Sequence, residues 1–271
     1  MIYYRTKNGI KLAEIWYNPA ELPDKKVDIL RYRFVKEKHV KATSIEEKYT
    51  LLSDLTNDEK ELFSKIHKNT KYKINRAKER DNIECSTFFA ADEKNTEKLS
   101  QYLDFFNTFA DSKGRSSAAL SEFEQFFEKG TLYIRSAMKD NTILAMHAYI
   151  VSDNIARLHQ SASHFRDSED SEYRNLVGRA NRFLHWDDMM YFKSFGVSWY
   201  DFGGWYAGHT DKEKLLIGQF KESFGGEKCR EYLYIVPVSV LGNISVYVHA
   251  VFRIGERINW RFKKTFRKIF R

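Results

Sequence analysis

The sequence predicts a mixed α/β (α+β) fold in which helices flank a mixed sheet, with an N-terminal extension and a C-terminal amphipathic helix. Between residues 83 and 236, short runs rich in β-branched and aromatic residues alternate with longer amphipathic runs. Three of the short runs follow one another across polar turns, which is typical of hairpins. The remaining runs alternate strand with helix, so parallel and antiparallel strands are expected in one sheet.

The first 82 residues are interpreted as an extension that shares this sheet. Its predicted strands are Val27–Lys36 and Tyr49–Leu55. Thr56, with Glu59 three positions later, fits a capping box at the start of a helix. The apolar spacing predicts that this helix runs without a break to about Arg80.

Residues 83–237 carry the regular pattern and are interpreted as the core domain. The predicted strands are 83–90, 131–138, 142–151, 154–163, 197–202 and 229–236, and the predicted helices are 92–110, 122–130, 171–195 and 211–224. Ser121 is predicted to cap the second of these helices and Gly196 to end the third. The expected order is therefore β-α-α-β-β-β-α-β-α-β.

The net charge of +8 is concentrated in one segment. Residues 252–271 contain eight basic residues and one acidic residue, Glu256, a formal charge of +7, so the rest of the chain is nearly neutral. This argues against general nucleic-acid binding, which needs an extended basic surface. We recognise no signal peptide and no apolar run long enough to span a bilayer. A soluble or peripheral cytoplasmic protein is expected, with Cys85 and Cys229 as reduced thiols.

Residues 238–271 are interpreted as a basic amphipathic tail. At about 100° per residue, apolar side chains from Val251 to Phe270 fall on one side of a helix and almost all basic side chains on the other. This pattern predicts binding of 252–271 to anionic lipid at the inner face of the cell membrane. The alternative is a C-terminal helix that packs its apolar stripe on the domain.

Two short motifs carry a resemblance to a known family. The sequence WYDFGG occupies 199–204, and IGQFKESFGG occupies 217–226. This pair resembles the second acyltransferase-like unit of the FemABX family, whose members pass amino acids from aminoacyl-tRNA to peptidoglycan precursors, and a wider group of GNAT-like proteins, several of them in polysaccharide gene clusters. The basic stretch KYKINRAKER at 71–80 is also similar to that family, and the predicted element order resembles the GNAT order. The resemblance implies that residues 1–82 are the remnant of a first GNAT-like unit.

The resemblance also implies a reaction centre at these motifs. Lys221 would lie beside it, where an ammonium group stabilises a developing oxyanion. Asp201 is expected either to take a proton or orient an acceptor amine, or only to cap its turn, and we weight these alternatives evenly. The predicted substrate-binding residues are Gly203, Gly204, Trp205 and Tyr206. Paired glycines directly after a strand permit positive φ and close backbone approach.

Two histidines on neighbouring predicted strands, His147 and His159, are further catalytic candidates, although a strand histidine is more often a satisfied core residue. Ser161 and Ser163 end the strand that opens the cleft in the resembling fold, so they are candidates for donor or acceptor binding. No group of residues has metal-ligand spacing, and no metal is expected.

The donor is expected to be acyl-CoA, with aminoacyl-tRNA as the alternative. GNAT enzymes that use acyl-CoA hold its pyrophosphate on backbone amides at the start of the helix after the third meander strand. The corresponding segment here has the pattern R-x-x-x-G-x-A beside an acidic loop, and its predicted donor-binding residues are Arg174, Gly178, Arg179 and Ala180. The basic helix 65–80 supports tRNA instead.

The expected function is transfer of an acyl or aminoacyl group onto an amine or hydroxyl of a sugar-containing envelope precursor, of the capsule, O-antigen or peptidoglycan type. The acceptor is expected to be a sugar nucleotide or a lipid-linked sugar. Catalysis would rest on positioning and oxyanion stabilisation, without a covalent enzyme intermediate. The alternatives are an aminoacyl-tRNA-dependent peptidoglycan bridge transferase and, from another class, a non-catalytic membrane-docked binding module.

Overall fold

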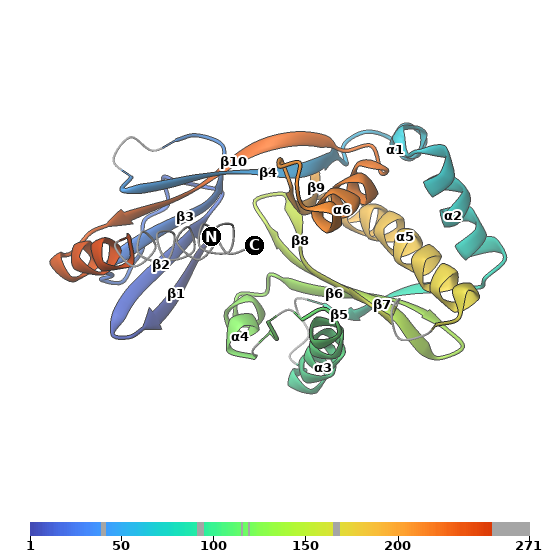
Figure 1. Ribbon diagram of the computed structural model, residues 1–271, viewed down its shortest axis with the longest axis horizontal. Helices are drawn as coiled ribbons and strands as arrows, with labels where there is room; N and C mark the ends of the chain where they lie inside the picture. Colours follow the sequence, from blue (N-terminus) through green and yellow to red (C-terminus); the bar gives the residue numbers. More distant parts are fainter. Residues whose placement is uncertain (39–41, 91–94, 115, 119, 165–168, 251–271) are drawn as a thin grey trace, which may run out of the picture. The chain divides into compact units, whose positions relative to one another are not determined.

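The computed structural model describes residues 1–38, 42–90, 95–114, 116–118, 120–164 and 169–250 (Figure 1). The chain forms two compact units. Of the described residues, one unit contains those of 1–48 and 230–250, and the other those of 49–229. The predicted division of the sequence at residues 82 and 237 into an extension, a core domain and a tail stays a prediction. Residues 251–271, which contain the basic tail, lie outside the described residues.

The first unit is built on four strands in the order β1-β2-β3-β10. Their bounds are Ile2–Lys7 (β1), Ile10–Trp16 (β2), Ile29–Val35 (β3) and Glu227–Pro237 (β10). β2 and β3 are parallel, and the other two pairs are antiparallel. The rings of Tyr32 and Tyr234 stack at 4.6 Å in the small core of this unit. β3 corresponds to the predicted strand Val27–Lys36. β1 and β2, which precede it, were not predicted from the sequence.

The second unit contains a six-stranded mixed sheet in the order β4-β9-β8-β7-β6-β5. The bounds are Ser44–Asp54 (β4), Glu84–Phe89 (β5), Leu132–Lys139 (β6), Thr142–Ser152 (β7), Ile155–Ser163 (β8) and Trp199–Trp205 (β9). Only β8 and β9 run parallel, and the other neighbours are antiparallel. The predicted meander is confirmed, and its turns at Asp140-Asn141 and Asp153-Asn154 all have positive φ.

Helices cover both faces of this sheet (Figure 1). Their bounds are Glu59–Lys65 (α1), Lys68–Glu79 (α2), Thr96–Ser112 (α3), Leu120–Glu128 (α4), Ser171–Ser194 (α5) and Lys212–Glu222 (α6). α3 and α4 lie on one face, and α5 lies on the other with α2 packed against it. The mixed α/β fold predicted from the sequence is confirmed.

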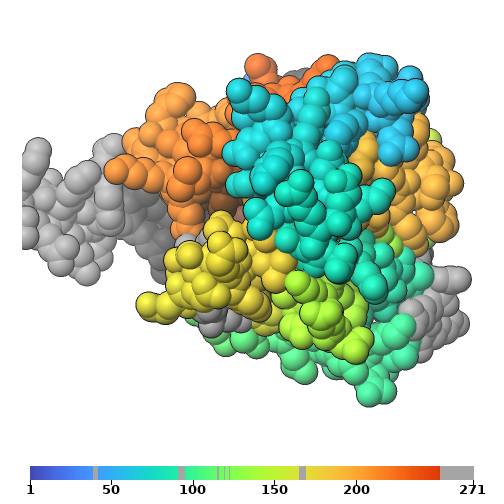
Figure 2. All heavy atoms as spheres, turned by 90° about the vertical axis from the view of Figure 1, so that its right-hand side faces the viewer, coloured from blue at the N-terminus to red at the C-terminus, as the bar shows by residue number. Residues whose placement is uncertain are grey.

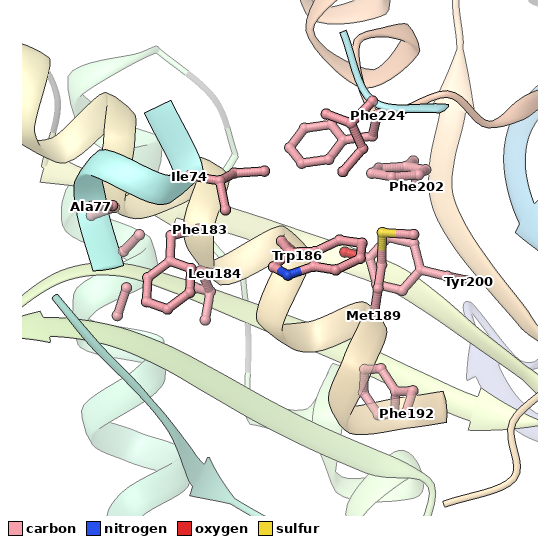
Figure 3. Packing of buried hydrophobic residues seen from close by; sticks show 14 of the residues in the cluster. Ile74, Ala77, Phe183, Leu184, Trp186, Met189, Phe192, Tyr200, Phe202 and Phe224 are labelled. Atoms are coloured by element: carbon pink, nitrogen blue, oxygen red, sulfur yellow. The ribbon is translucent and has the colours of Figure 1, made fainter. Parts of the chain in front are cut away.

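The core of the second unit lies between α5 and the sheet (Figure 3). Long apolar side chains of α5, among them Phe183, Trp186 and Phe192, point into a cluster with Tyr200 and Phe202 from β9. Each fully buried aromatic side chain contributes about 1.5–3 kcal/mol relative to exposure. This packing holds α5 and β9 together, and both carry residues of the site described below.

The predicted capping box at Thr56 is wrong. The amide and hydroxyl of Thr56 both bond to the Asp54 carboxylate, so this residue completes a turn and does not start the helix. Asp58 is the N-cap of α1, and its side chain accepts from the amide of Glu61. The predicted cap at Ser121 is also wrong, because α4 begins at Leu120 and Ser121 lies inside the helix.

The predicted continuous helix to Arg80 is interrupted after Lys65. Ile66 has extended backbone geometry, and His67 caps a second helix through its ring nitrogen Nδ1, which accepts from the amide of Asn69 at 3.3 Å. The amide of His67 donates to the carbonyl of Ser223 at 2.8 Å, so the break fixes α1 and α2 to the end of α6. Within the described residues, no helix is long and apolar enough to cross a bilayer.

Candidate active site

The second motif ends where the α1–α2 break contacts it. Gly225 has φ +81°, and a β-carbon there would lie 2.5 Å from the carbonyl oxygen of Lys65, so only glycine fits. The hydroxyl of Thr70 on α2 lies 2.9 Å from that of Ser223. The FGG sequence and the basic stretch are thus parts of one packed corner, which orients the last turn of α6.

Asp201 is buried in β9 and has all its interactions within the protein. Its Oδ1 accepts from the hydroxyl of Thr50 and from the amide of Gly203 at 2.8 Å, and its Oδ2 accepts from Arg157 Nη1 at 2.6 Å. The carboxylate therefore neutralises a buried guanidinium and fixes the backbone at Gly203. These bonds make Asp201 a positioning residue in the present geometry.

The two glycines lie within β9, and not in a turn after it as predicted. Gly203 has φ +71°, and a β-carbon there would lie 2.9 Å from the carbonyl oxygen of Leu158. The pairing of β4 with β9 shifts register at this point, between Thr50 and Leu52. The expected positive φ and close backbone approach are present, as a bulge in the strand.

Lys221 on α6 lies over this bulge. Its Nζ donates to the carbonyl oxygen of Gly204 at 2.8 Å. Burial lowers the pKa of Lys221 to about 8, against the opposing effect of Asp201. The structure thus brings together four of the predicted site residues: Asp201, Gly203, Gly204 and Lys221.

A second cationic side chain, Arg182 on α5, lies near an α6 residue that flanks Lys221. Arg182 lies over the ring of Phe220 at 4.8 Å and donates from Nη1 to the carbonyl of Gly178 at 2.8 Å. Within the described part of the chain, no carboxylate forms an ion pair with Arg182 and no acceptor meets its Nε. Burial lowers the pKa of Lys73 on α2, and so do the charges of Arg182 and Arg179. Among the described residues, Arg182 therefore contributes a positive charge that no carboxylate pairs.

A chain of hydrogen bonds leads from the core to the same corner. The hydroxyl of Tyr149 donates to Asp188 Oδ2 at 2.6 Å and lies 2.6 Å from the hydroxyl of Tyr200, which lies 2.7 Å from His185 Nδ1. Each hydroxyl has one hydrogen. Because Tyr149 donates to Asp188, Tyr200 must donate to Tyr149, and His185 Nδ1 must carry a proton and donate to Tyr200.

His185 consequently has a defined tautomer. Burial, and after it the charges of His147, Lys221 and Arg182, holds its pKa well below the usual range, so the ring is neutral and Nε2 keeps its lone pair. No described side chain hydrogen-bonds this nitrogen. The ring lies 5.4 Å from that of Phe220, next to Lys221 in sequence. The ring is 2% exposed and also packs on Phe202 and Phe224, so its Nε2 lone pair is oriented to accept a proton, but the burial that keeps it neutral also lowers its basicity.

Known proteins were compared with the chain at the level of sequence and of structure. No protein family and no curated protein matches the sequence. The structure is similar to that of FemX, with a TM-score of 0.63 and 12% identity over 86% of this chain and 83% of that one. The chain has a FemX-like fold.

Two further structures share this fold. One is the C-terminal domain of a putative lysylphosphatidylglycerol synthetase from Agrobacterium fabrum, with a TM-score of 0.54 and 12% identity over 92% of this chain and 84% of that one. The other is L-PGS from Bacillus licheniformis, with a TM-score of 0.54 and 10% identity over 91% and 84%. The resemblance read from the two motifs is therefore confirmed for the fold.

The two strand histidines occupy different environments in the FemX-like fold. His147 is fully buried, with Nδ1 2.8 Å from Asp188 Oδ2 and Nε2 2.9 Å from Asn181 Oδ1. His159 lies beside the rings of Phe123 and Phe126 on the α4 side. The ring of His147 lies 4.2 Å from that of His185 on α5. Ser161 and Ser163 lie on β8, as His159 does, and pair with His147 and Ala145 of β7.

The first backbone amides of α5 are hydrogen-bonded by the N-cap residue of the helix, Asp170. The carboxylate of Asp170 accepts from the amides of Glu172 at 2.9 Å and Tyr173 at 3.4 Å. Of the four predicted donor-binding residues, Arg179 pairs with Asp81 and Ala180 is fully buried. Arg174 and Gly178 lie partly exposed on the same half of the helix.

Trp205 and Tyr206 lie beside α6. The indole Nε1 of Trp205 donates to Glu222 at 2.8 Å, and the Lys228 ammonium lies 4.0 Å from the ring centre. The hydroxyl of Tyr206 lies 3.3 Å from that of Thr210. Among the described residues, no three histidine, cysteine or acidic side chains gather as metal ligands.

Proposed function

We propose that the chain is an acyltransferase that moves an aminoacyl or acyl group onto an amine or hydroxyl of a sugar-containing cell-envelope precursor. The observation that carries the proposal is the bond from Lys221 Nζ to Gly204 O, because it joins the two motifs of the resembling family at one point. An ammonium group held there is suited to neutralise the oxyanion that forms when a nucleophile adds to an acyl carbon.

His185 would supply the base. The nucleophile of the acceptor attacks the acyl carbon and passes its proton to Nε2, while the resulting charge on the Nδ1 side is stabilised through Tyr200 and Tyr149 by Asp188. The bond from the acyl carbon to the donor oxygen or sulfur then breaks, and the leaving group takes up the proton. No covalent enzyme intermediate is needed.

The positive corner at Arg182 and Lys73 supports a substrate that carries phosphate. A guanidinium without a carboxylate partner is costly to bury and is well suited to bind a phosphate oxygen. Both proposed acceptors, a sugar nucleotide and a lipid-linked sugar, contain phosphate. The acceptor would thus place its phosphate on α5 and its nucleophile near His185.

Aminoacyl-tRNA is the donor that we favour, with acyl-CoA as the second candidate. The Asp170 carboxylate already occupies amides at the start of α5, and a second anion there would be repelled. α2 carries Lys68, Lys71, Lys78 and Arg76 outside its three buried residues, on a helix that Figure 2 shows at the surface, whereas Lys73 belongs to the corner with Arg182. Such a helix can contact a nucleic-acid backbone.

The names of the similar structures support an aminoacyl group as the group transferred. A lysylphosphatidylglycerol synthetase, by its name, joins lysine to a phospholipid, and FemX bears the name of the resembling family. We place the reaction at the cytoplasmic face of the membrane, with the basic residues of 252–271 on anionic lipid.

A transfer assay with defined donors tests the proposal. Purified full-length protein is incubated with a sugar-nucleotide and lipid-linked sugar extract and either labelled aminoacyl-tRNA or labelled acetyl-CoA, and the acceptor's mass is measured. We expect a mass increase with aminoacyl-tRNA that Lys221→Ala abolishes. Lys214→Ala, an exposed lysine on the same helix, is the matched control and should be fully active. Binding of the extract without transfer from any donor would favour the non-catalytic module.

A further inference from the structure

The helical segment 240–250 of the first unit contacts Asp28 through Ser239 and Gly242, and Ser245 and Val246 are partly buried. The hydroxyl of Ser239 donates to Asp28 Oδ1 at 2.6 Å, and it accepts from the amide of Gly242 at 3.0 Å, as an N-cap does. A β-carbon at Gly242 would lie 2.0 Å from the carbonyl oxygen of Asp28. The side of the helix that faces the protein is therefore defined by Gly242 and Ser239.

The opposite side of this segment is apolar and exposed. Val240 is 78% exposed, Ile244 55% and Tyr247 72%, and the neighbouring exposed residues of the face are Leu241 and Val248. On a helix of about 100° per residue, these five side chains lie within one sector about 120° wide. We call them the outer face.

This arrangement is the reverse of that in an ordinary surface helix. A helix of a globular protein buries its apolar stripe and leaves its polar side in water. Here the described segment contains no lysine, arginine, aspartate or glutamate, and its apolar side faces away from the unit it packs on. An exposed contiguous apolar surface of this kind marks a docking site for another apolar phase.

The sequence that follows favours an anionic lipid surface as the partner. Residues 252–271 carry a formal charge of +7, which favours a negatively charged partner. Counted on from Val240 at about 100° per residue, Val251, Ile258 and Phe262 fall in the sector of the outer face. In the sequence, the apolar spacing of the outer face therefore recurs in the tail.

We propose that the outer face of residues 240–250 inserts into the headgroup boundary of an anionic bilayer. Val240, Leu241, Ile244, Tyr247 and Val248 supply the apolar contact, and the basic residues after them supply the electrostatic attraction. This site is distinct from the transfer site and requires no catalysis. It extends the proposed membrane location from the tail to a docked, oriented part of the first unit.

Vesicle flotation of the full chain tests the proposal. The probes are vesicles of phosphatidylcholine alone and of phosphatidylcholine mixed with phosphatidylglycerol. The wild type should float with the mixed vesicles. The triple variant Val240→Ser, Ile244→Ser, Tyr247→Ser keeps the whole basic tail, and its partition should fall about tenfold or more because three inserted side chains are lost. Leu22→Ser, another exposed apolar residue of the first unit, should float like the wild type.

Three results would overturn the inference. If the triple variant floats as well as the wild type, the tail binds without the outer face. If the wild type does not float at low salt, the face has no lipid partner. If sedimentation shows a dimer that the triple variant dissociates, a second copy of the chain is the occupant. All four substituted side chains are exposed, so thermal unfolding should be unchanged and a misfolded variant is recognised by that measurement.

Discussion

The ammonium group of Lys221 donates to the carbonyl oxygen of Gly204 at 2.8 Å, so the FKESFGG helix is bonded to the WYDFGG strand. Neither residue would hold the other in place alone. Gly204 is fixed because Asp201 binds the preceding amide, and α6 is fixed because Gly225 packs on Lys65. The two motifs thus provide two fixed backbone segments, the bulge of β9 and the end of α6, which one hydrogen bond joins.

Replacement of Lys221 should remove transfer and change its pH profile. We expect Lys221→Ala to lower kcat about 100-fold or more, as removal of one oxyanion donor does in other enzymes. In the wild type, kcat should fall as pH rises through about 8, because the ammonium loses its proton there. Lys221→Arg should retain part of the activity without this alkaline decline, since a guanidinium stays charged. An unchanged alkaline limb in Lys221→Arg would contradict the assignment.

Asp201 and Arg157 should behave as a coupled buried pair. Removing one charge leaves the other buried and unpaired, so Asp201→Asn and Arg157→Met should each lower the free energy of unfolding by about 3–5 kcal/mol. The double variant should lose less than the sum of the two. Urea unfolding of all four proteins measures the coupling, and additive losses would show that the pair is not a unit.

Local chemistry explains why the meander was predictable. The turns at Asp140-Asn141 and Asp153-Asn154 need residues that tolerate positive φ. Asp and Asn are such residues, so these dipeptides predict the turns from sequence. β2 gives no such signal. Its buried Glu14 interrupts the apolar pattern, and it is tolerated because Arg31 and Arg33 on β3 bind both carboxylate oxygens. That pairing exists only after the strands have met.

The same reasoning applies to the candidate site. Lys221 and the glycines were found because they belong to contiguous motifs. His185 was missed because its partners Tyr200 and Tyr149 come from two other elements. The one available signal was Asp188, a carboxylate on the apolar side of a long helix, which predicts a buried polar network.

Alanine should destabilise the protein much more at Gly203 than at Gly204. Gly203→Ala meets the Leu158 carbonyl at 2.9 Å in a strained conformation, so we expect a loss of more than about 2 kcal/mol of unfolding free energy. Gly204→Ala meets nothing within 4 Å and should change stability by less than about 1 kcal/mol. Gly196→Ala, strained at φ +76° but also in open space, should fall between them. Thermal or urea unfolding ranks the three, and equal losses would contradict the bulge at Gly203.

His185 should make the protein less stable in mild acid. Its pKa is lowered by folding, so below about pH 6.5 the unfolded chain binds a proton that the folded protein does not. The free energy of unfolding should therefore decrease as pH falls, by about 1.4 kcal/mol per pH unit from this group alone.

Replacement by glutamine should remove that slope. His185→Gln deletes the titrating group, so the difference in unfolding free energy between wild type and variant should shrink steadily from pH 7 to pH 5. His209→Gln changes an exposed histidine outside the hydrogen-bond chain and serves as the control, which should be as stable and as active as the wild type at pH 7. Transfer measured at pH 7 supplies the second readout. His185→Gln should lose it, whereas Tyr200→Phe, which keeps the ring but frees the imidazole tautomer, should lose only part. If His185→Gln keeps full activity and the acid slope together, the imidazole is neither the buried neutral group nor the base that the chain of hydrogen bonds to Asp188 implies.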